Sequence, residues 1–417
     1  MAIFSRRTVS WMLYDWASSP VPTLHATFIF SVYFTTQIMP EQGSFYWSQM
    51  TALAAIAVGV LSPFVGRLAD IRGWVKPGLM ISTGVGAVAV ALLWYALPSS
   101  EYALYALIIS GITIFCVEIA FVFYNSWLVS VAPTKKMGEV SGYGWALGYI
   151  GAIVALALVL VFLILPEEPV FGIGTEAAAH VRAVMICAGL WLIIFSLPLF
   201  LLCPAPPPVQ QESSGFFASL KQTVKLALTI PGLGRFLLAR MAFTDGLITL
   251  FAFGGIYAAK VFDFSQQDIL IFAISLNLTA GLGAALAARM TDRLGTIRTI
   301  RLSLIGLILC GCLAWLAPTA SLFWGAGLAL GIFVGPAQSA ARAHIGMIAP
   351  AEYRASLFGL FMFSGKITSF VGPLFYGWLV FGFGTERAGM GIVILLLILG
   401  LVLLPGAQHE SGTKPLA

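Results

Sequence analysis

Charged residues are unusually scarce in this sequence. Asp, Glu, Lys and Arg together make up 9% of the 417 residues, whereas hydrophobic residues make up 59%. Soluble globular chains carry about a quarter charged residues, because their surfaces must be hydrated. The shortage extends along the whole chain and does not mark one anchor segment. The composition therefore excludes an ordinary soluble domain and indicates a chain that crosses a lipid bilayer many times.

The sequence also lacks the patterns of a disulfide framework, a metal centre and a nucleotide-dependent enzyme. Its cysteines lie in apolar stretches with neither paired extracellular spacing nor metal-ligand spacing. It contains no Gly-Lys-Ser/Thr phosphate-binding loop and no paired histidines with a glutamate at helical spacing. We therefore expect no metal, no cofactor and no enzymatic activity. An intramembrane enzyme with Glu118 and His344 as an acid–base pair is the alternative.

Apolar runs long enough to cross a bilayer, which takes roughly 20 helical residues, occur in two sets of six. The first set lies near residues 11–38, 46–69, 75–97, 102–131, 139–165 and 181–203. The second set lies near residues 232–261, 267–290, 297–317, 320–348, 353–380 and 385–405. This layout predicts an all-α membrane protein with about twelve transmembrane helices in two six-helix bundles.

A polar interruption separates the two sets of runs. It begins with a proline-rich stretch at 204–208 and continues with polar residues at 210–214, so it cannot span the membrane. Hydrophobic residues then recur at helical spacing from Phe216 to Leu228, which predicts an amphipathic helix on the inner membrane face. An ordinary solvated helix is the alternative. We therefore expect four parts: an N-terminal bundle at 1–203, a cytosolic linker at 204–231, a C-terminal bundle at 232–405 and a cytosolic tail at 406–417.

The basic residues are distributed unevenly among the loops. Cytosolic loops of membrane proteins retain positive charge during insertion. If the N-terminus lies in the cytosol, most Lys and Arg residues of loops and helix ends fall on the cytosolic side. The exceptions, which fall outside, are Arg182, Lys260 and Arg387. We therefore expect both termini in the cytosol. The net charge of +5 reflects this topology and not nucleic-acid binding, because the basic residues do not gather on a water-exposed domain.

A short motif occurs at matching places in the two halves. Residues 66–73 read Gly-Arg-Leu-Ala-Asp-Ile-Arg-Gly, and residues 288–295 read Ala-Arg-Met-Thr-Asp-Arg-Leu-Gly. Such duplication is common in transporters built from two related halves around a central site. A carboxylate at a helix end, close to arginines of the next loop, can hold neighbouring helices in one conformation. The residues predicted to act in gating here are Asp70, Arg72, Arg289, Asp292 and Arg293.

Ionisable residues inside the apolar runs are the best indicators of a site. Each costs a few kcal/mol at bilayer depth unless it faces a cavity or a partner. At a rise of about 1.5 Å per residue, Glu118, Asp245 and Lys366 lie near the middle of the membrane. Arg240 and Arg342 lie nearer the cytosolic end, where they suit a gate. The predicted substrate or proton-coupling residues are Asp15, Glu118, Asn125, Asp245 and Lys366.

A protonatable acid deep in the membrane can take a proton from one side and release it on the other, and we predict this role for Glu118 or Asp245. Pairing of Lys366 with one of these acids, to lock helices together, is the alternative. Polar residues in the same runs can orient a small zwitterion, although helix-to-helix hydrogen bonds are the simpler and favoured explanation for each of them. The predicted cavity-lining residues are Tyr14, His25, Tyr124, Tyr257, Asn277 and Gln338.

The duplicated motif resembles the signature loop of the major facilitator superfamily, in which a glycine and a small run precede an aspartate and Arg-x-Gly. A closer resemblance, to the vacuole-effluxer branch of that superfamily, is carried by three stretches. These are Tyr-Asp-Trp-Ala-Ser-Ser at 14–19, Phe-Tyr-Asn-Ser-Trp-Leu at 123–128 and Ser-Gly-Tyr-Gly-Trp-Ala-Leu-Gly-Tyr at 141–149. The chain departs from the branch at Ser18, where asparagine is usual, and at Pro20, where tyrosine is usual.

This resemblance implies the major facilitator fold, with runs one, four, seven and ten around a central cavity, and transport by alternating access. It also implies a bacterial inner-membrane protein that works with a small-molecule substrate and a proton or other cation, and we expect a monomer. Fungal members of the branch are vacuolar amino-acid effluxers, so proton-coupled efflux of amino acids or related metabolites is the predicted function. A proton-coupled drug or sugar exporter and a non-transporting receptor or scaffold are the alternatives.

Overall fold

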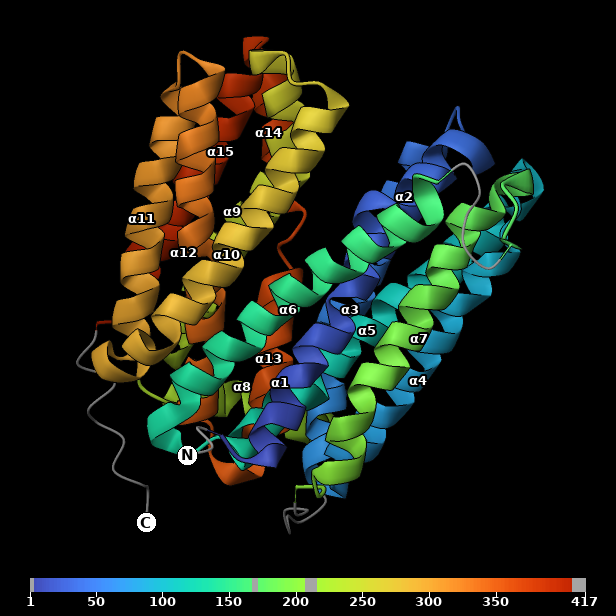
Figure 1. The fold of residues 1–417 in the computed structure, drawn as a ribbon. Helices are drawn as coiled ribbons and strands as arrows, with labels where there is room; N and C mark the ends of the chain where they lie inside the picture. Colours follow the sequence, from blue (N-terminus) through green and yellow to red (C-terminus); the bar gives the residue numbers. More distant parts are fainter. Residues whose placement is uncertain (1–3, 167–171, 207–215, 407–417) are drawn as a thin grey trace.

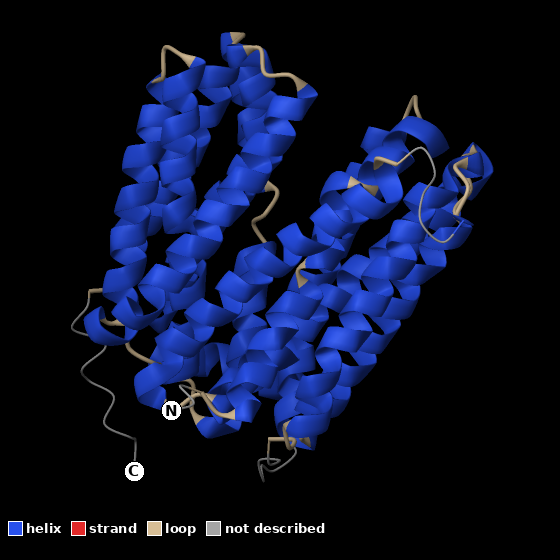
Figure 2. Ribbon diagram, viewed as in Figure 1, coloured by secondary structure: helices blue, strands red, loops and turns tan. Residues whose placement is uncertain are grey.

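A computed structural model describes residues 4–166, 172–206 and 216–406 of the chain. In these ranges the structure consists of helices and connecting loops, without a strand (Figure 2). The same ranges contain 11 helices that are long and apolar enough to cross a membrane. The predicted all-α membrane fold is therefore confirmed. The tail predicted at 406–417 lies outside the described residues except for its first position.

The N-terminal half follows the predicted order of runs. Its continuous helices are α3 (Gly43–Arg72), α4 (Val75–Leu92), α5 (Ala103–Val131), α6 (Met137–Val159) and α7 (Ala179–Leu202). The C-terminal half contains α9 (Leu233–Phe262), α10 (Gln266–Leu294), α11 (Thr296–Leu316), α12 (Ala320–Ile348), α13 (Arg354–Lys366), α14 (Val371–Phe383) and α15 (Glu386–Leu403). The linker includes a helix, α8 (Phe216–Thr229), at the position where the amphipathic helix was predicted.

The first predicted run is helical but divided into short segments. These are α1 (Arg6–Ser18), η1 (Pro22–Phe28), α2 (Phe30–Tyr33) and η2 (Phe34–Ile38). Proline has no backbone N–H and cannot donate to the helical ladder, so Pro20 and Pro22 interrupt the regular pattern. The backbone then continues as wide π-helical turns in η1 and η2. This division explains why residues 6–38 are absent from the 11 continuous spanning helices in the described ranges.

Two helix ends show how local sequence sets the boundaries. Gly73 ends α3 with a left-handed backbone at φ 65°, which glycine adopts without a steric penalty. At the start of α10, Ser265 Oγ accepts from the Asp268 amide, and the Asp268 carboxylate accepts from the Ser265 amide at 3.0 Å. This reciprocal capping satisfies two free backbone donors. The hydrogen bonds from Ser265 lower the pKa of the exposed Asp268 carboxyl.

The two halves approach each other at one end of the molecule and diverge towards the other (Figure 1). We call the end at which α1, α6 and α13 begin the junction end. Helix α6 of the N-terminal half packs against α10, and α3 packs against α13. These two pairs join the halves. Large apolar side chains such as Leu286, Leu201 and Phe381 are exposed on the outside of the bundles, as a lipid-facing surface requires.

Small residues allow the joining helices to approach closely. A Cβ on Gly142 of α6 would lie 2.6 Å from the Cβ of Ala288 on α10. On the other helix pair, a Cβ on Gly66 of α3 would overlap the backbone carbonyl of Ala355 on α13. Both separations are shorter than a packed carbon contact permits, so glycine is required for this arrangement of the halves.

Candidate functional site

A cavity of about 790 Å³ lies between the two halves. On the N-terminal side it is lined by η1, α3 and α5, and on the C-terminal side by α9, α13 and α14. A smaller cavity of about 250 Å³ shares Glu118, Phe121, Ile248 and Lys366 with the larger one. It is also lined by residues of α6 and α12. Spans two, five and eleven thus contribute to this region, in addition to the four spans that the resemblance implied.

The boundary shared by the two cavities carries an ion pair between the halves. Lys366 Nζ of α13 donates to Glu118 Oε1 of α5 at 2.7 Å. The two side chains are 24% and 27% exposed, so the pair is partly solvated. Lys366 therefore pairs with Glu118, one of the two acids that the sequence analysis named as its possible partners. Because both charges remain in contact with the cavity, the pair can exchange partners without large desolvation costs.

Arg240 of α9 reaches into the smaller cavity next to this pair. Its Nη1 donates to the carbonyl oxygen of Phe361 and, at 2.9 Å, to Ser364 Oγ. The guanidinium also lies over the Phe361 ring, 3.5 Å from its centre. Among the described residues, no carboxylate lies within 4.0 Å of Arg240. The cavity therefore contains a cation held by neutral groups.

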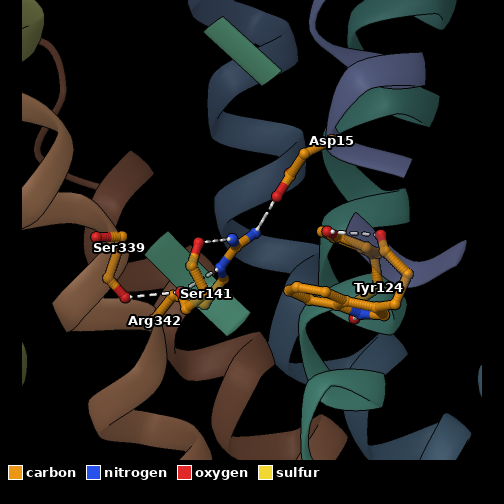
Figure 3. A network of polar contacts seen from close by, with 6 residues as sticks. Asp15, Tyr124, Ser141, Ser339 and Arg342 are labelled. Atoms are coloured by element: carbon orange, nitrogen blue, oxygen red, sulfur yellow. Dashed lines mark hydrogen bonds and ion pairs between the residues drawn. The ribbon is translucent and has the colours of Figure 1, made fainter. Parts of the chain in front are cut away.

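A second ion pair, between Asp15 and Arg342, is buried at the interface of α1, α6 and α12 (Figure 3). Arg342 Nη1 lies 2.9 Å from Asp15 Oδ2, and the side chains are 3% and 7% exposed. Arg342 also donates from Nε to Ser141 Oγ at 2.9 Å and from Nη2 to Ser141 O at 2.7 Å. Ser141 Oγ in turn donates to Ser339 O at 2.8 Å. The network connects both halves through buried, hydrogen-bonded charges.

The two motif aspartates hold helix N-termini of the opposite half. The Asp70 carboxylate accepts from the amides of Ala355 and Ser356 at 2.9 and 2.7 Å and from Ser356 Oγ at 2.5 Å, at the start of α13. The Asp292 carboxylate accepts from the amides of Gly138 and Glu139 at 2.7 and 2.8 Å, at the start of α6. A carboxylate is stabilising there because helix N-termini present free N–H groups and partial positive charge. Asp70 and Asp292 occupy equivalent positions in the duplicated motif, so the two contacts correspond to each other in the two halves.

The arginine three residues before each aspartate supports the same contact. Arg289 Nε donates to Glu139 Oε1 at 2.9 Å, next to the helix start that Asp292 caps. Arg67 lies over the ring of Tyr353, 5.0 Å from its centre, next to the helix start that Asp70 caps. Both arginines thus contact the half opposite to their own.

The sequence predicted that arginines of the following loop lie close to these aspartates. In the described residues neither Asp70 nor Asp292 forms an ion pair with an arginine, and their hydrogen-bond partners lie at helix N-termini instead. Arg72 lies over the Trp74 ring at 5.2 Å, and Arg293 lines a hollow of about 430 Å³ together with Asp292, without forming an ion pair with it. Free helix ends provide enough hydrogen-bond donors to replace an arginine.

Asp245, the other predicted mid-membrane acid, contacts the break in the eleventh span. Its Oδ2 accepts from the amide of Gly372 at 3.1 Å, at the start of α14. Its Oδ1 is buried and has no hydrogen-bond partner among the described residues. Asp245 does not line either cavity described above. The structure therefore separates it from Glu118 and places it at a helix N-terminus.

The predicted cavity-lining residues divide into two groups. Tyr14 and Tyr124 are buried in the N-terminal half, where their hydroxyls bond Thr83 Oγ1 at 2.7 Å and Trp11 O at 3.1 Å. These are helix-to-helix bonds, as the simpler explanation stated. The others line cavities: His25 the larger one, Gln338 the smaller one, and Tyr257 and Asn277 a third one of about 350 Å³ mainly within the C-terminal half. Asn125, which was predicted to act in substrate or proton coupling, also lines the smaller cavity.

The acid–base pair of the enzymatic alternative is not assembled. Glu118 pairs with Lys366, whereas His344 Nδ1 hydrogen-bonds Thr296 Oγ1 at 2.8 Å in a buried position.

The sequence prediction missed Trp145 and Ser141 as site residues. Both belong to the stretch at 141–149 that carries the family resemblance, which was the available signal.

Two family models match the chain. The model described as "Vacuole effluxer Atg22 like" matches residues 131–416, and the model described as "Major Facilitator Superfamily" matches residues 2–156. Together they cover nearly the whole sequence. The first alone covers more than half of it.

Similar proteins occur in bacteria and fungi. "Uncharacterized MFS-type transporter YxiO" of Bacillus subtilis (strain 168) is 24% identical over 423 residues, covering 99% of the chain and 97% of that protein. "Autophagy-related protein 22" of Cryptococcus neoformans var. neoformans serotype D (strain B-3501A) is 26% identical over 304 residues, covering 66% of the chain and 54% of that protein. The chain thus spans about half the length of the fungal relatives it matches.

Solved structures of low sequence identity share the fold. FucP, a major facilitator superfamily transporter in the outward conformation, superposes with a TM-score of 0.72 at 13% identity, covering 99% of both chains. The proton:xylose symporter XylE superposes with a TM-score of 0.72 at 12% identity, covering 95% of this chain and 94% of that one. At these identities the likeness establishes the architecture alone.

Proposed function

Because the chain belongs to the family described as vacuole effluxer Atg22 like, we propose that it exports amino acids or related small metabolites in exchange for protons. Its family and its major facilitator fold make it a membrane-embedded secondary transporter of small molecules and not an enzyme. The choice of amino acids rests on the resemblance to the vacuole-effluxer branch, whose fungal members are amino-acid effluxers, and on the polar residues that line the smaller cavity. We further propose a monomer in a bacterial inner membrane with both termini in the cytosol.

The contacts at the junction end support an outward-facing state. With the termini in the cytosol, the junction end is the cytosolic end, and it is closed by the Asp15–Arg342 pair and by the capping contacts of Asp70 and Asp292. All of these contacts join opposite halves. Alternating access requires that they break together when the cavity opens to the cytosol.

Glu118 is the favoured proton carrier, and the observation that carries this assignment is its partly solvated ion pair with Lys366 between the halves. Protonation of Glu118 removes one charge of the pair and so removes an attraction between α5 and α13. The 27% exposure of the Glu118 side chain gives the carboxylate a route to solvent protons. Asp245 does not line either of these cavities and bonds a helix N-terminus, which favours a structural role for it.

The test is solute flux by the purified protein in proteoliposomes. Counterflow and uptake are measured across a panel of amino acids, peptides, sugars and drug-like cations, with and without an imposed pH gradient. We expect saturable amino-acid flux that the gradient accelerates. Flux of a sugar or a drug-like cation alone would replace the proposed substrate class. A folded protein without flux of any member would favour the receptor or scaffold alternative.

A further inference from the structure

The third cavity, of about 350 Å³, lies apart from the two central ones. Helices α9, α10, α11, α12 and α15 of the C-terminal half enclose most of it, and η1 of the N-terminal half adds one wall. It shares no lining residue with either central cavity. The central cavities contain Glu118, Arg240 and Lys366, whereas the described residues that line this one include no charged side chain. We call it the aromatic cavity.

Aromatic rings form much of the wall of this cavity. The ring centres of Phe272 and Phe323 lie 5.2 Å apart, and Tyr257 packs against Phe323 at 5.7 Å. Trp315 lines the same space, and a Cβ on Gly254 would meet no atom within 4 Å. Pockets for drug-sized molecules occupy about 300–1,000 Å³, so this cavity suits a molecule of one or two rings. Aromatic ligands pack favourably against such walls, by offset or edge-to-face contacts.

The hydroxyl and indole donors of the cavity are already used by the protein. Tyr257 Oη donates to Trp315 O at 3.0 Å, and Trp315 Nε1 donates to Arg387 O at 2.6 Å. The hydroxyls of Thr23 and Thr27 donate to carbonyl oxygens of the preceding turn. A carboxylate needs a cation or several free donors when it leaves water. The aromatic cavity therefore does not suit an anion or an amino-acid zwitterion.

Asn277 provides an acceptor at this wall. Its Nδ2 donates to Ala273 O at 2.8 Å, while its Oδ1 accepts no hydrogen bond from the described residues. This oxygen is also not among the enclosed atoms that lack a partner, so it keeps accessible surface. An accessible amide oxygen on an otherwise apolar wall favours a ligand that carries one hydrogen-bond donor. A plain acyl chain from the bilayer has no such donor.

We propose that the aromatic cavity binds a neutral aromatic molecule with one hydrogen-bond donor, placing the donor on Asn277 Oδ1 and the rings against Trp315 and Phe323. This site is separate from the substrate path and does not depend on the proposed function. Because Thr23 and Phe28 of η1 line it, the bound molecule contacts both halves. It therefore favours the present arrangement of the halves over any arrangement that removes η1 from the cavity.

The experiment measures binding of 5-fluoroindole to the purified protein in detergent micelles, by the broadening of its fluorine NMR signal. Empty micelles at the same detergent concentration give the background from partitioning. We expect saturable binding that indole displaces. Benzofuran has the same two rings without the N–H, so it should displace the probe about twofold to tenfold less well. Equal displacement by both compounds, or no binding above the micelle background, overturns the proposal.

Asn277→Leu tests the polar contact and leaves the aromatic wall in place. We expect this variant to bind indole and benzofuran equally, because the acceptor is gone. The preference is a ratio measured on one preparation, so a partial loss of folded protein does not alter it. A wild-type preference for indole in Asn277→Leu would contradict the assignment of the donor to Asn277.

Gly311→Leu tests the location of the site. A Cβ on Gly311 would lie 3.9 Å from both Ile394 Cγ1 and Leu330 Cδ1, and these two side chains line the cavity. A leucine there occupies the space of the ligand, and we expect a loss of at least about tenfold in 5-fluoroindole affinity. Gly325→Leu, at an exposed position of α12 where a Cβ would meet no atom within 4 Å, is the matched control and keeps wild-type binding. Unchanged binding by Gly311→Leu would place the site elsewhere.

A flux measurement tests the separation from the substrate path, and this arm alone rests on the proposed function. Indole is expected to lower the maximal rate of amino-acid counterflow in proteoliposomes without changing the apparent substrate affinity. Competition between indole and the transported amino acid would show one shared site and overturn the proposal. If the protein binds 5-fluoroindole as described but transports no amino acid, the aromatic site stands and the proposed export fails.

Discussion

The two ion pairs that join the halves differ in their surroundings. Asp15 and Arg342 are 7% and 3% exposed and are surrounded by further hydrogen bonds, whereas Glu118 and Lys366 are 27% and 24% exposed at a cavity. A buried charge that loses its partner is strongly destabilising, but a partly solvated one is hydrated instead. The first pair is therefore suited to hold one conformation, and the second to respond to protons and substrate.

The largest effect is expected from breaking the buried pair. Arg342→Gln leaves the Asp15 carboxylate without its cation in a buried position, which costs about 3–5 kcal/mol of unfolding free energy. The double variant Asp15→Asn with Arg342→Gln recovers part of this loss, because no charge is then left unpaired. Denaturant unfolding in detergent micelles measures both. Equal stability of Arg342→Gln and the wild type would show that the pair contributes nothing at the junction.

A smaller effect is expected from separating α6 and α10, one of the two helix pairs that join the halves. Gly142→Ala introduces a Cβ 2.6 Å from Ala288, so α6 and α10 must move apart, at a cost of about 1–3 kcal/mol. Gly84→Ala on α4 is the matched control, since its Cβ would meet no atom within 4 Å. Thermal unfolding compares the two. If the control is destabilised as much as Gly142→Ala, the close approach of α6 and α10 does not explain the effect.

The capping contacts come next in size. Asp70→Asn and Asp292→Asn each weaken a charged cap and are expected to cost about 0.5–2 kcal/mol. Asp70 accepts three hydrogen bonds and Asp292 two, so the loss should be larger at Asp70. Unfolding of the two variants under identical conditions gives the order. The reverse order would show that the number of donors does not set the strength of the contact.

The smallest stability effect belongs to the solvated pair. Glu118→Gln is expected to change the unfolding free energy by less than about 1 kcal/mol, because Lys366 remains in contact with the cavity. Denaturant unfolding of Glu118→Gln and Arg342→Gln under the same conditions compares the loss of unfolding free energy in the two variants. A loss as large as that of Arg342→Gln would mean that the Glu118–Lys366 pair is not exchangeable.

Much of the fold could be predicted from sequence because lipid imposes simple rules. Long apolar runs located the spans, and the matching motifs at 66–73 and 288–295 indicated two related halves. The division of the first span was not predicted in detail, since Pro20 and Pro22 indicate a break but not the π-helical turns that follow it. Helix α8 was located correctly from the spacing of its apolar residues.

The candidate site was less predictable, because the chemistry of an ionisable residue depends on its partner. The sequence identified Asp15, Glu118, Arg342 and Lys366 as exceptional, but their pairing depends on helices from opposite halves that are distant in sequence. Likewise, the partners of Asp70 are backbone amides at a helix start, which no residue pattern records. Trp145 was not selected, since tryptophan in an apolar run is usually a packing residue.

The most direct test of the central claim compares two kinds of flux in Glu118→Gln, with Asp245→Asn as the parallel variant. Counterflow of the amino acid identified for the wild type needs no net proton movement, whereas accumulation driven by a pH gradient does. If Glu118 carries the proton, Glu118→Gln retains counterflow and loses the response to the gradient, while Asp245→Asn keeps both. Full gradient-driven transport by Glu118→Gln, or its loss in Asp245→Asn alone, would contradict the account.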